Sequence, residues 1–253
     1  MKRTIEEIKA LLSEIEISSE LLQELKADER KSVQKALEIY DRKVEKRKEA
    51  EYKFEEMSMF EKEIWAQGFQ AIAGVDEVGR GPLAGPVVSA AVILPKTYKV
   101  LGLNDSKLLS DKKRNQLYKE IQKYAVAIGI GMATVEEIDT LNIYQASRLA
   151  MKRAIGNLSK PCDYLCIDAM ELDLNIPQKS IIKGDRKSVS IAAASIVAKQ
   201  TRDQMMVEFS KVYPGYGFEK NMGYGTKEHL DGLNQFGVTP IHRRSFTPVK
   251  DLL

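Results

Sequence analysis

Cysteine and histidine are scarce in this sequence of 253 residues. Only Cys162 and Cys166 occur, four positions apart, and only His229 and His242 supply imidazoles. The two cysteines cannot form a disulfide framework and lack the spacing of a metal knuckle, so they are expected to be apolar residues of a core strand. An imidazole zinc site would lack ligands, and a Ser-His-Asp arrangement would have to use one of these two histidines. Carboxylates are therefore the better candidates for catalytic chemistry.

Long hydrophobic runs are absent as well. No apolar stretch approaches the ~18 residues of a membrane span, although 43% of the residues are hydrophobic and 30% are charged. The N-terminus, MKRTIEEIKALLSEIE, has acidic residues within its apolar pattern, which fits neither a secretory signal nor an acid-poor transit peptide. We expect a globular, cytoplasmic protein without a membrane segment.

Residues 1–70 have no proline and a single glycine, Gly68, whereas the remaining chain holds all eight prolines. The first segment carries 14 basic and 17 acidic residues, and the remainder carries 25 basic and 19 acidic residues. Helical spacing of apolar residues predicts helices in the first segment, with Ser18 or Ser19 as an N-cap and one long charged helix over residues 28–65. We predict a helical extension over residues 1–69 and a second domain over residues 70–253.

After Gly68, short apolar runs alternate with helical patterns. Strands are predicted at FQAIAGVDEVG, GPVVSAAVIL, AVAIGIGMAT, DYLCIDAM and SIIKGD. Helical spacing occupies the longer intervals, including a helix broken near Leu141 and Asn142 and a long helix that opens with Ser188. Two adjacent strands followed by alternating helices and strands predict a layered α/β domain whose sheet need not be wholly parallel.

Three of the predicted strands lead into acidic residues. Asp76 and Glu77 end the first strand, Asp168 ends the fourth, and Asp185 follows the fifth. A carboxylate at the rim of a core needs a partner, and clustered carboxylates repel one another unless a cation neutralises them. Because Mg²⁺ and Mn²⁺ prefer oxygen ligands, convergence of these four acids would form a divalent-cation site. Each acid taken singly could instead be an N-cap, a turn former or half of a surface ion pair.

A glycine-rich turn, VGRGPLAG, follows the first strand and is neither a Walker loop nor a GxGxxG dinucleotide motif. Its glycines could bring the backbone close to a sugar, or they could simply permit a tight turn. Basic and aromatic residues elsewhere favour a polyanionic ligand, although ordinary packing stays an alternative for each of them. They are Lys107, Lys183, Lys199, Arg202, Arg243 and Arg244, together with Tyr213, Tyr216 and Tyr224.

Eight motifs follow one another along roughly residues 70–250: AGVDEVGRGPLAGPVV, GLNDSKLLS, EIDTLNIYQAS, YLCIDAM, IIKGD, SIAAASIVAKQTRD, MGYGTKEHL and HRRSFTPV. In this order and spacing they strongly resemble bacterial ribonuclease HII, the type 2 ribonuclease H, and residues 1–70 resemble the N-terminal extension of Gram-positive members. One departure is Leu108, where a second lysine is common. The resemblance implies a ribonuclease H-like mixed five-stranded sheet flanked by helices, with a small helical C-terminal part.

The resemblance also implies an endonuclease that cleaves the RNA strand of RNA/DNA hybrids. It implies cutting on the 5′ side of single ribonucleotides embedded in duplex DNA, leaving 3′-hydroxyl and 5′-phosphate ends. Two cations about 3.5–4 Å apart would activate a water and neutralise the leaving oxygen. Recognition of a ribose 2′-hydroxyl by backbone groups would make cutting independent of the base.

Residue roles follow from the same resemblance. The metal-binding catalytic acids would be Asp76, Glu77, Asp168 and Asp185, with Mg²⁺ or Mn²⁺ as the cofactor. The ribose 2′-hydroxyl would be recognised by Gly79, Arg80 and Gly81, and the sugar at the RNA-DNA junction would stack on Tyr224. Phosphates would be contacted by Lys107, Lys183, Ser195 and Lys199.

Two other functions stay open on the sequence alone. The protein could be another nuclease or a strand-transfer enzyme of the same fold that acts on DNA alone, or a non-catalytic nucleic-acid binding module whose acids are structural. The N-terminal extension is expected to be either an added substrate clamp or a helical docking surface for another protein. Because no sustained heptad repeat occurs, we expect a monomer.

Overall fold

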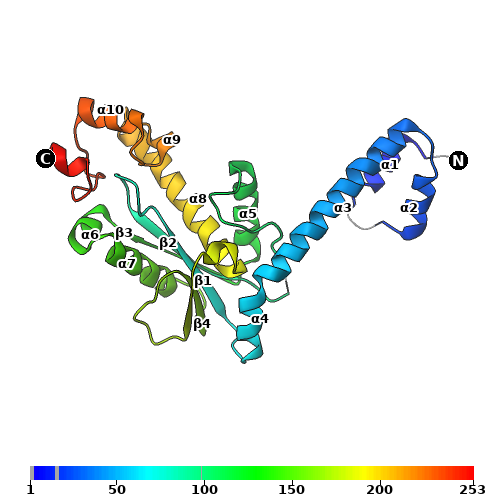
Figure 1. Ribbon diagram of the computed structural model, residues 1–253, viewed down its shortest axis with the longest axis horizontal. Helices are drawn as coiled ribbons and strands as arrows, with labels where there is room; N and C mark the ends of the chain where they lie inside the picture. The colour runs from blue at the N-terminus through cyan, green and yellow to red at the C-terminus, as the bar shows by residue number, and fades with distance from the viewer. Residues whose placement is uncertain (1–2, 15–16, 98) are drawn as a thin grey trace. The chain divides into compact units, whose positions relative to one another are not determined.

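Five strands form one mixed sheet in the order β3-β2-β1-β4-β5 (Figure 1). Antiparallel pairing joins β1 to β2 and β2 to β3, whereas β4 pairs parallel with both β1 and β5. The strands are β1 (Ile72–Val78), β2 (Val87–Ile93), β3 (Ala127–Ala133), β4 (Tyr164–Asp168) and β5 (Gln178–Ile181). The predicted α/β fold with a mixed five-stranded sheet is confirmed.

Two helices, α7 (Ile143–Gly156) and α8 (Val189–Val212), cover opposite faces of this sheet (Figure 1). Because successive side chains of a strand point to opposite faces, Ala73 and Val75 of β1 pack in the layer of α7. Gly74 lies on the other face, directly against the backbone at the start of α8. This close approach places the side of β1 that carries Asp76 next to α8.

Other helices complete this part of the chain: α5 (Asp111–Tyr124), α6 (Val135–Leu141), α9 (Phe218–Asn221), α10 (Lys227–Phe236) and the 3-10 turns η1 (Gly184–Arg186) and η2 (Val249–Leu252). Asn142 separates α6 from α7 with a positive φ of 72°, and its side chain accepts from the Tyr144 and Gln145 amides. The predicted break near Leu141 and Asn142 is confirmed.

The structure, a computed structural model, describes residues 3–14, 17–97 and 99–253. Contacts divide the chain into two compact units, Met1–Lys53 and Phe54–Leu253. The first unit contains α1 (Ile5–Leu11), α2 (Ser19–Lys26) and most of α3 (Lys31–Met57). Its core is formed by residues with the predicted helical spacing, which include Ile8, Leu25, Val33 and Leu37. Ser18 caps α2 as predicted, because its side chain accepts from the Leu21 amide.

The single long helix predicted over residues 28–65 is wrong. The helix α3 ends at Met57, and α4 (Met59–Ala66) begins after Ser58, whose hydroxyl donates to the Phe54 carbonyl at 2.6 Å. A serine that bonds to a carbonyl one turn earlier competes with regular helix hydrogen bonds. Ile64 of α4 is buried in the cluster that contains Cys166, so this helix packs with the sheet. The division of domains after residue 69 stays a prediction.

Candidate active site

Asp76 and Asp168 lie at the carboxyl ends of two neighbouring parallel strands. The register pairs Val75 of β1 with Ile167 of β4, so the next position along each strand brings the two acids side by side. Neighbouring strands lie about 4.8 Å apart. The topology therefore brings together two acids that are far apart in the sequence.

Asp76 is almost fully buried, with 6% of its surface exposed. Burial raises the pKa of this carboxyl well above its ordinary value, and the charges of Glu77 and Asp168 raise it further. A hydrogen bond with the Ser195 side chain of α8 opposes the rise. Ser195 is itself buried and its hydroxyl lies 2.9 Å from that of Ser106. The site thus holds a carboxylate whose negative charge is poorly compensated.

Glu77 contributes a second costly carboxylate. Its Oε1 lies 3.6 Å from the Arg80 guanidinium, but its Oε2 is buried without a hydrogen-bond partner. Burial raises the pKa of Glu77, Arg80 opposes the rise, and the charge of Asp168 adds to it. A buried oxygen without a partner costs about 1–3 kcal/mol. A cation next to Glu77 would remove that cost.

Asp168 and Asp185 are held by the short turn η1. The Gly184 amide donates to Asp168 Oδ1 at 2.7 Å, and Asp185 is the next residue of that turn. Burial raises the pKa of both carboxyls, and the charge of Asp168 further raises that of Asp185. The pKa is therefore raised for each of the four predicted acids, as expected for carboxylates that are partly desolvated near one another.

These acids fit a divalent cation by their chemistry. They offer only oxygen ligands, which suit Mg²⁺ or Mn²⁺. In residues 3–14, 17–97 and 99–253, no group of three or more His, Cys, Asp or Glu side chains is already arranged to hold a metal ion. The unpartnered Oε2 of Glu77 and the raised pKa values nevertheless mark the place where a divalent cation would be most stabilising.

Asp105 is a site residue that the sequence reasoning missed. It is 4% exposed, and its carboxylate accepts from the Lys107 amide at 2.9 Å and from the Arg186 guanidinium at 2.8 Å. Burial alone would raise its pKa, but these hydrogen bonds outweigh burial and the pKa is lowered. An Asx-turn forms when an Asp side chain accepts from the backbone amide two residues later. The order Asp-Ser-Lys in the sequence is compatible with such a turn and was the available signal for Asp105. Asp105 thereby fixes the backbone at Lys107, whose charge opposes the rise in the pKa of Asp168.

The glycine-rich turn after β1 meets the loop that carries Tyr224. Gly79 has φ of 93°, a conformation that favours glycine, and both Arg80 and Gly81 are exposed. A Cβ added to Gly81 would lie 3.5 Å from the Tyr224 ring. Tyr224 is 43% exposed, so its ring is available to a ligand.

Tyr216 does not share this exposure. Only 3% of its surface is accessible, because it packs in a core cluster with Phe218 and Leu233. The expectation that the Tyr216 ring helps to bind a polyanionic ligand is therefore wrong.

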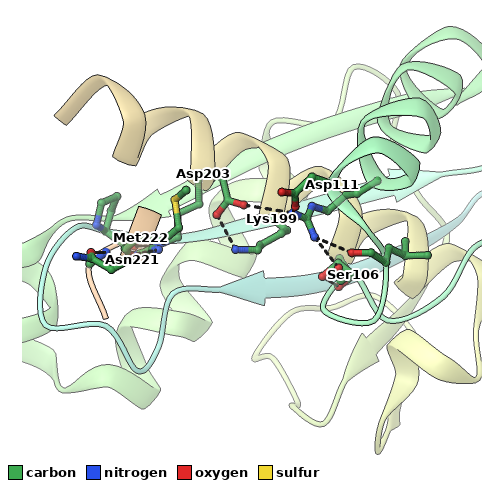
Figure 2. A network of polar contacts seen from close by, with 12 residues as sticks. Ser106, Asp111, Lys199, Asp203, Asn221 and Met222 are labelled. Atoms are coloured by element: carbon green, nitrogen blue, oxygen red, sulfur yellow. Dashed lines mark hydrogen bonds and ion pairs between the residues drawn. The ribbon is translucent and has the colours of Figure 1, made fainter. Parts of the chain in front are cut away.

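The predicted phosphate-binding lysines differ in their surroundings. Lys107 and Lys183 are exposed, and Lys183 has a left-handed backbone just before Gly184. Lys199 is half-buried on α8, where its ammonium lies 2.7 Å from Asp203 (Figure 2). Lys107 and Lys183 are thus free to meet a phosphate, whereas Lys199 already has an anionic partner.

Arg202 and Arg243 cannot contact phosphates from where they lie. Both side chains are fully buried, and their guanidinium groups donate to backbone carbonyls of the protein. Their sequence neighbourhood had suggested a surface that binds a polyanion, and that suggestion is wrong for these two residues.

The two histidines bond to each other beneath the Tyr224 loop. Their Nε2 atoms lie 3.0 Å apart, and the Thr239 amide donates to Nδ1 of His242. His242 must then carry its proton on Nε2 and donate it to His229, whose Nδ1 donates to the Tyr224 carbonyl at 2.9 Å. Both rings are neutral in this chain of hydrogen bonds, which anchors the backbone of Tyr224.

Acid is expected to destabilise the fold through this pair. Burial, together with the charge of His229, lowers the pKa of His242 to about 4. The unfolded chain, with a histidine pKa near 6.5, binds the proton first. Stability is therefore unaffected above about pH 6.5 and falls by about 3 kcal/mol as the pH drops from there toward 4. Urea unfolding at several pH values should give a smaller loss for His242→Gln. An equal loss in both proteins would contradict this assignment.

Known protein families match most of this chain. The family described as Ribonuclease HII matches residues 73–249, and the Ribonuclease HII N-terminal domain matches residues 4–65. A ribonuclease HII of Enterococcus faecalis is 57% identical over 254 residues, which cover 100% of this chain and 99% of that protein.

Two solved structures share the fold. The ribonuclease H2 of Pyrococcus horikoshii has a TM-score of 0.63 at 23% identity, over 72% of this chain and 97% of that one. The structure of Bst-RNase HIII in complex with Mn²⁺ has a TM-score of 0.54 at 17% identity, over 72% of this chain and 69% of that one. With the family match and the close relative, this chain belongs to the ribonuclease HII family and is an endonuclease of the ribonuclease H type.

Proposed function

We propose that this protein hydrolyses the RNA strand of RNA/DNA hybrids and also cuts on the 5′ side of single ribonucleotides in duplex DNA. The observation that carries the proposal is the position of Asp76 and Asp168, each one residue beyond the Val75–Ile167 pair, near the turn whose residues Arg80 and Gly81 are exposed. The acids suit a phosphodiester with its cations, and the turn suits a ribose. Family membership supports hybrid cleavage, and the products would carry 3′-hydroxyl and 5′-phosphate ends.

We infer that Asp76, Glu77, Asp168 and Asp185 hold two divalent cations, either Mg²⁺ or Mn²⁺. Cations bound there would lower the pKa of the attacking water and neutralise charge on the leaving oxygen. The raised pKa values and the unpartnered Oε2 of Glu77 support these residues as ligands. Mn²⁺ is bound in the related Bst-RNase HIII structure. Without a cation, the acids would repel the phosphate they must approach.

The chain's other residues would bind and orient the substrate. We infer that backbone groups of Gly79, Arg80 and Gly81 recognise the 2′-hydroxyl and that Tyr224 stacks on the adjacent sugar. The Tyr224 ring lies 3.5 Å from where a Cβ of Gly81 would be, and this proximity supports a shared ribose site.

Four residues are proposed to contact phosphates: Lys107, Lys183, Ser195 and Lys199. The exposure of the two lysines Lys107 and Lys183 supports this role. Ser195 and Lys199 already have protein partners, so a smaller contribution is expected from them.

Cleavage mapping tests the proposal. Three substrates of one sequence are compared: an RNA/DNA hybrid, a DNA duplex with one ribonucleotide, and an all-DNA duplex. We expect cutting of the hybrid, one cut on the 5′ side of the single ribonucleotide, no cutting of DNA, and complete loss of activity with EDTA. Equal cutting of the all-DNA duplex would favour a DNA nuclease or strand-transfer enzyme. Binding without any product, insensitive to chelator, would favour a non-catalytic module.

The N-terminal unit contains a groove of about 530 Å³. Apolar residues that include Leu12, Ala36 and Ile39 line it together with Lys9 and Lys35. Residues 1–53 contain 13 basic and 13 acidic residues, so they lack the positive field that a nucleic-acid clamp uses. We propose that this groove docks an acidic segment of a protein partner. Replacing Lys9 and Lys35 with glutamine is then expected to leave affinity for the hybrid unchanged.

No helix within the described residues is long and apolar enough to cross a bilayer.

We propose that the enzyme acts as a monomer in the cytoplasm, where bacterial duplex DNA is found.

A further inference from the structure

Arg202 and Arg243 are fully buried cations that form no ion pair within the described part of the chain. Arg202 lies on α8, and Arg243 belongs to the segment after α10. Their guanidinium groups instead donate to backbone carbonyls around the glycine-rich turn. Arg243 donates to Gly79, Arg80 and Gly85, and Arg202 donates to Ala84, Pro86 and Met222.

Burial of these two cations is costly, because each guanidinium leaves water without a carboxylate partner. Burial lowers the pKa of Arg202 to about 10 and that of Arg243 to about 9, with the charge of Arg202 contributing to the second shift. Both groups are still cationic at neutral pH. The carbonyl dipoles around them take the place of a counterion, so the guanidinium groups and the turn stabilise each other.

The hydrogen bonds of Arg243 fix the direction of two peptide groups. Besides the Gly85 carbonyl, its guanidinium donates to the carbonyl of Gly79 and, at 2.8 Å, to the carbonyl of Arg80. In a trans peptide the N–H of the next residue points opposite to the carbonyl. The amides of Arg80 and Gly81 therefore point away from Arg243, and within the described residues neither has a hydrogen-bond acceptor.

The turn itself accommodates nothing larger than glycine at residue 79. A Cβ there would lie 2.2 Å from Nε of Arg202, and φ of 93° is unfavourable for other residues. The Arg202 guanidinium thus fills the space beside Gly79, while Arg80 and Gly81 are exposed and Gly81 lies next to the Tyr224 ring. The two unpaired amides are held in place before any substrate binds.

We propose that Arg243, supported by Arg202, is a positioning residue that sets the preference for ribose over deoxyribose. It holds the Gly79 and Arg80 carbonyls inward so that the next two amides are presented to the 2′-hydroxyl, an inference that rests on the proposed function. Donors that are already oriented cost little reorganisation on binding. Lysine should not substitute, because its ammonium is a point charge that cannot span the same carbonyls.

Affinity for matched duplexes tests this role. An Asp76→Asn background prevents turnover, and binding is measured for a DNA duplex with one ribonucleotide and for the all-DNA duplex of the same sequence. We expect the background protein to prefer the ribonucleotide. Arg243→Lys should reduce that preference by about tenfold or more, with affinity for all-DNA within about twofold. Arg153→Lys is the control, because Arg153 also donates to a backbone carbonyl, that of Met132, but on the side of α7.

The outcomes separate the inference from the function. A folded Arg243→Lys protein that keeps the full preference would overturn the inference, and equal weakening for both duplexes would indicate a purely structural role and also overturn it. A background protein without any preference would overturn the proposed function instead. Should Arg243→Lys not fold, amide hydrogen exchange of the unsubstituted protein is measured instead. Exchange at the Arg80 and Gly81 amides should slow when the ribonucleotide duplex binds but not when the all-DNA duplex binds. Equal exchange rates with the two duplexes would refute the proposal.

Discussion

Asp76→Asn is expected to lower cleavage of an RNA/DNA hybrid at least about a thousandfold while hybrid affinity stays within about threefold. The substitution removes the negative charge of Asp76, which lies next to Asp168 where β1 and β4 end. It thereby removes a proposed ligand of the cations. Binding should survive because the lysines that face the substrate are unchanged. Single-turnover cleavage and binding on the same hybrid give the two numbers.

The same substitution should make the protein more stable in the absence of metal. The pKa of Asp76 is raised by burial and by the charges of Glu77 and Asp168, so ionised Asp76 destabilises the fold at neutral pH. A purely structural carboxylate would behave in the opposite way and lose stability on replacement. Asp173→Asn is the matched control, because Asp173 is exposed, and it should change neither activity nor melting temperature. Cleavage by Asp76→Asn at the wild-type rate in Mg²⁺ would eliminate the metal-ligand assignment.

Gly74→Ala is expected to destabilise the sheet domain by about 3 kcal/mol. A Cβ at residue 74 would lie 2.0 Å from the Ser190 carbonyl carbon and 2.3 Å from the Ile191 nitrogen. These are backbone atoms, so only a shift of α8 away from β1 makes room. That shift would also separate Ser195 from Asp76. Urea unfolding measures the loss, and cleavage at a temperature where the variant is folded measures the second effect.

Gly156→Ala provides the control for this substitution. Gly156 ends α7, has no atom within 4 Å of an added Cβ, and does not have a positive φ. Alanine there should be neutral or stabilising by up to about 1 kcal/mol, since alanine favours helix more than glycine does. If Gly74→Ala is as stable as Gly156→Ala, then β1 and α8 are not in the close contact that defines the site.

The sequence predicts the strands and the acids at their ends, but not which strands are neighbours. Apolar runs bounded by turns locate β1 and β4, and Asp76 and Asp168 are visible as acids that end them. Their meeting depends on a parallel pairing between strands with three helices and two further strands between them in the chain. Such nonlocal pairing has no signal in a single sequence, so only the resemblance to a family could predict the cluster.

Local hydrogen bonds explain other differences between expectation and structure. Ser58 interrupts a charged helix that the spacing of apolar residues predicts to be continuous. Arg202 and Arg243 resemble surface cations in the sequence because they lie among other charged residues, in AKQTRD and HRRSF. Their partners in the structure include carbonyls of a turn more than a hundred residues earlier. Asp105 was overlooked because its role is to orient Lys107 and Arg186 through a short turn.

Mn²⁺ binding, followed by the loss of the free-ion signal in electron paramagnetic resonance, tests the central role of the four acids most directly. The full-length protein should take up Mn²⁺, and Asp168→Asn should weaken that uptake at least about tenfold, since a carboxylate ligand is lost. Asp173→Asn should bind as the parent does. Equal Mn²⁺ binding by the parent and by Asp168→Asn would contradict the account, because the ion would then be held elsewhere.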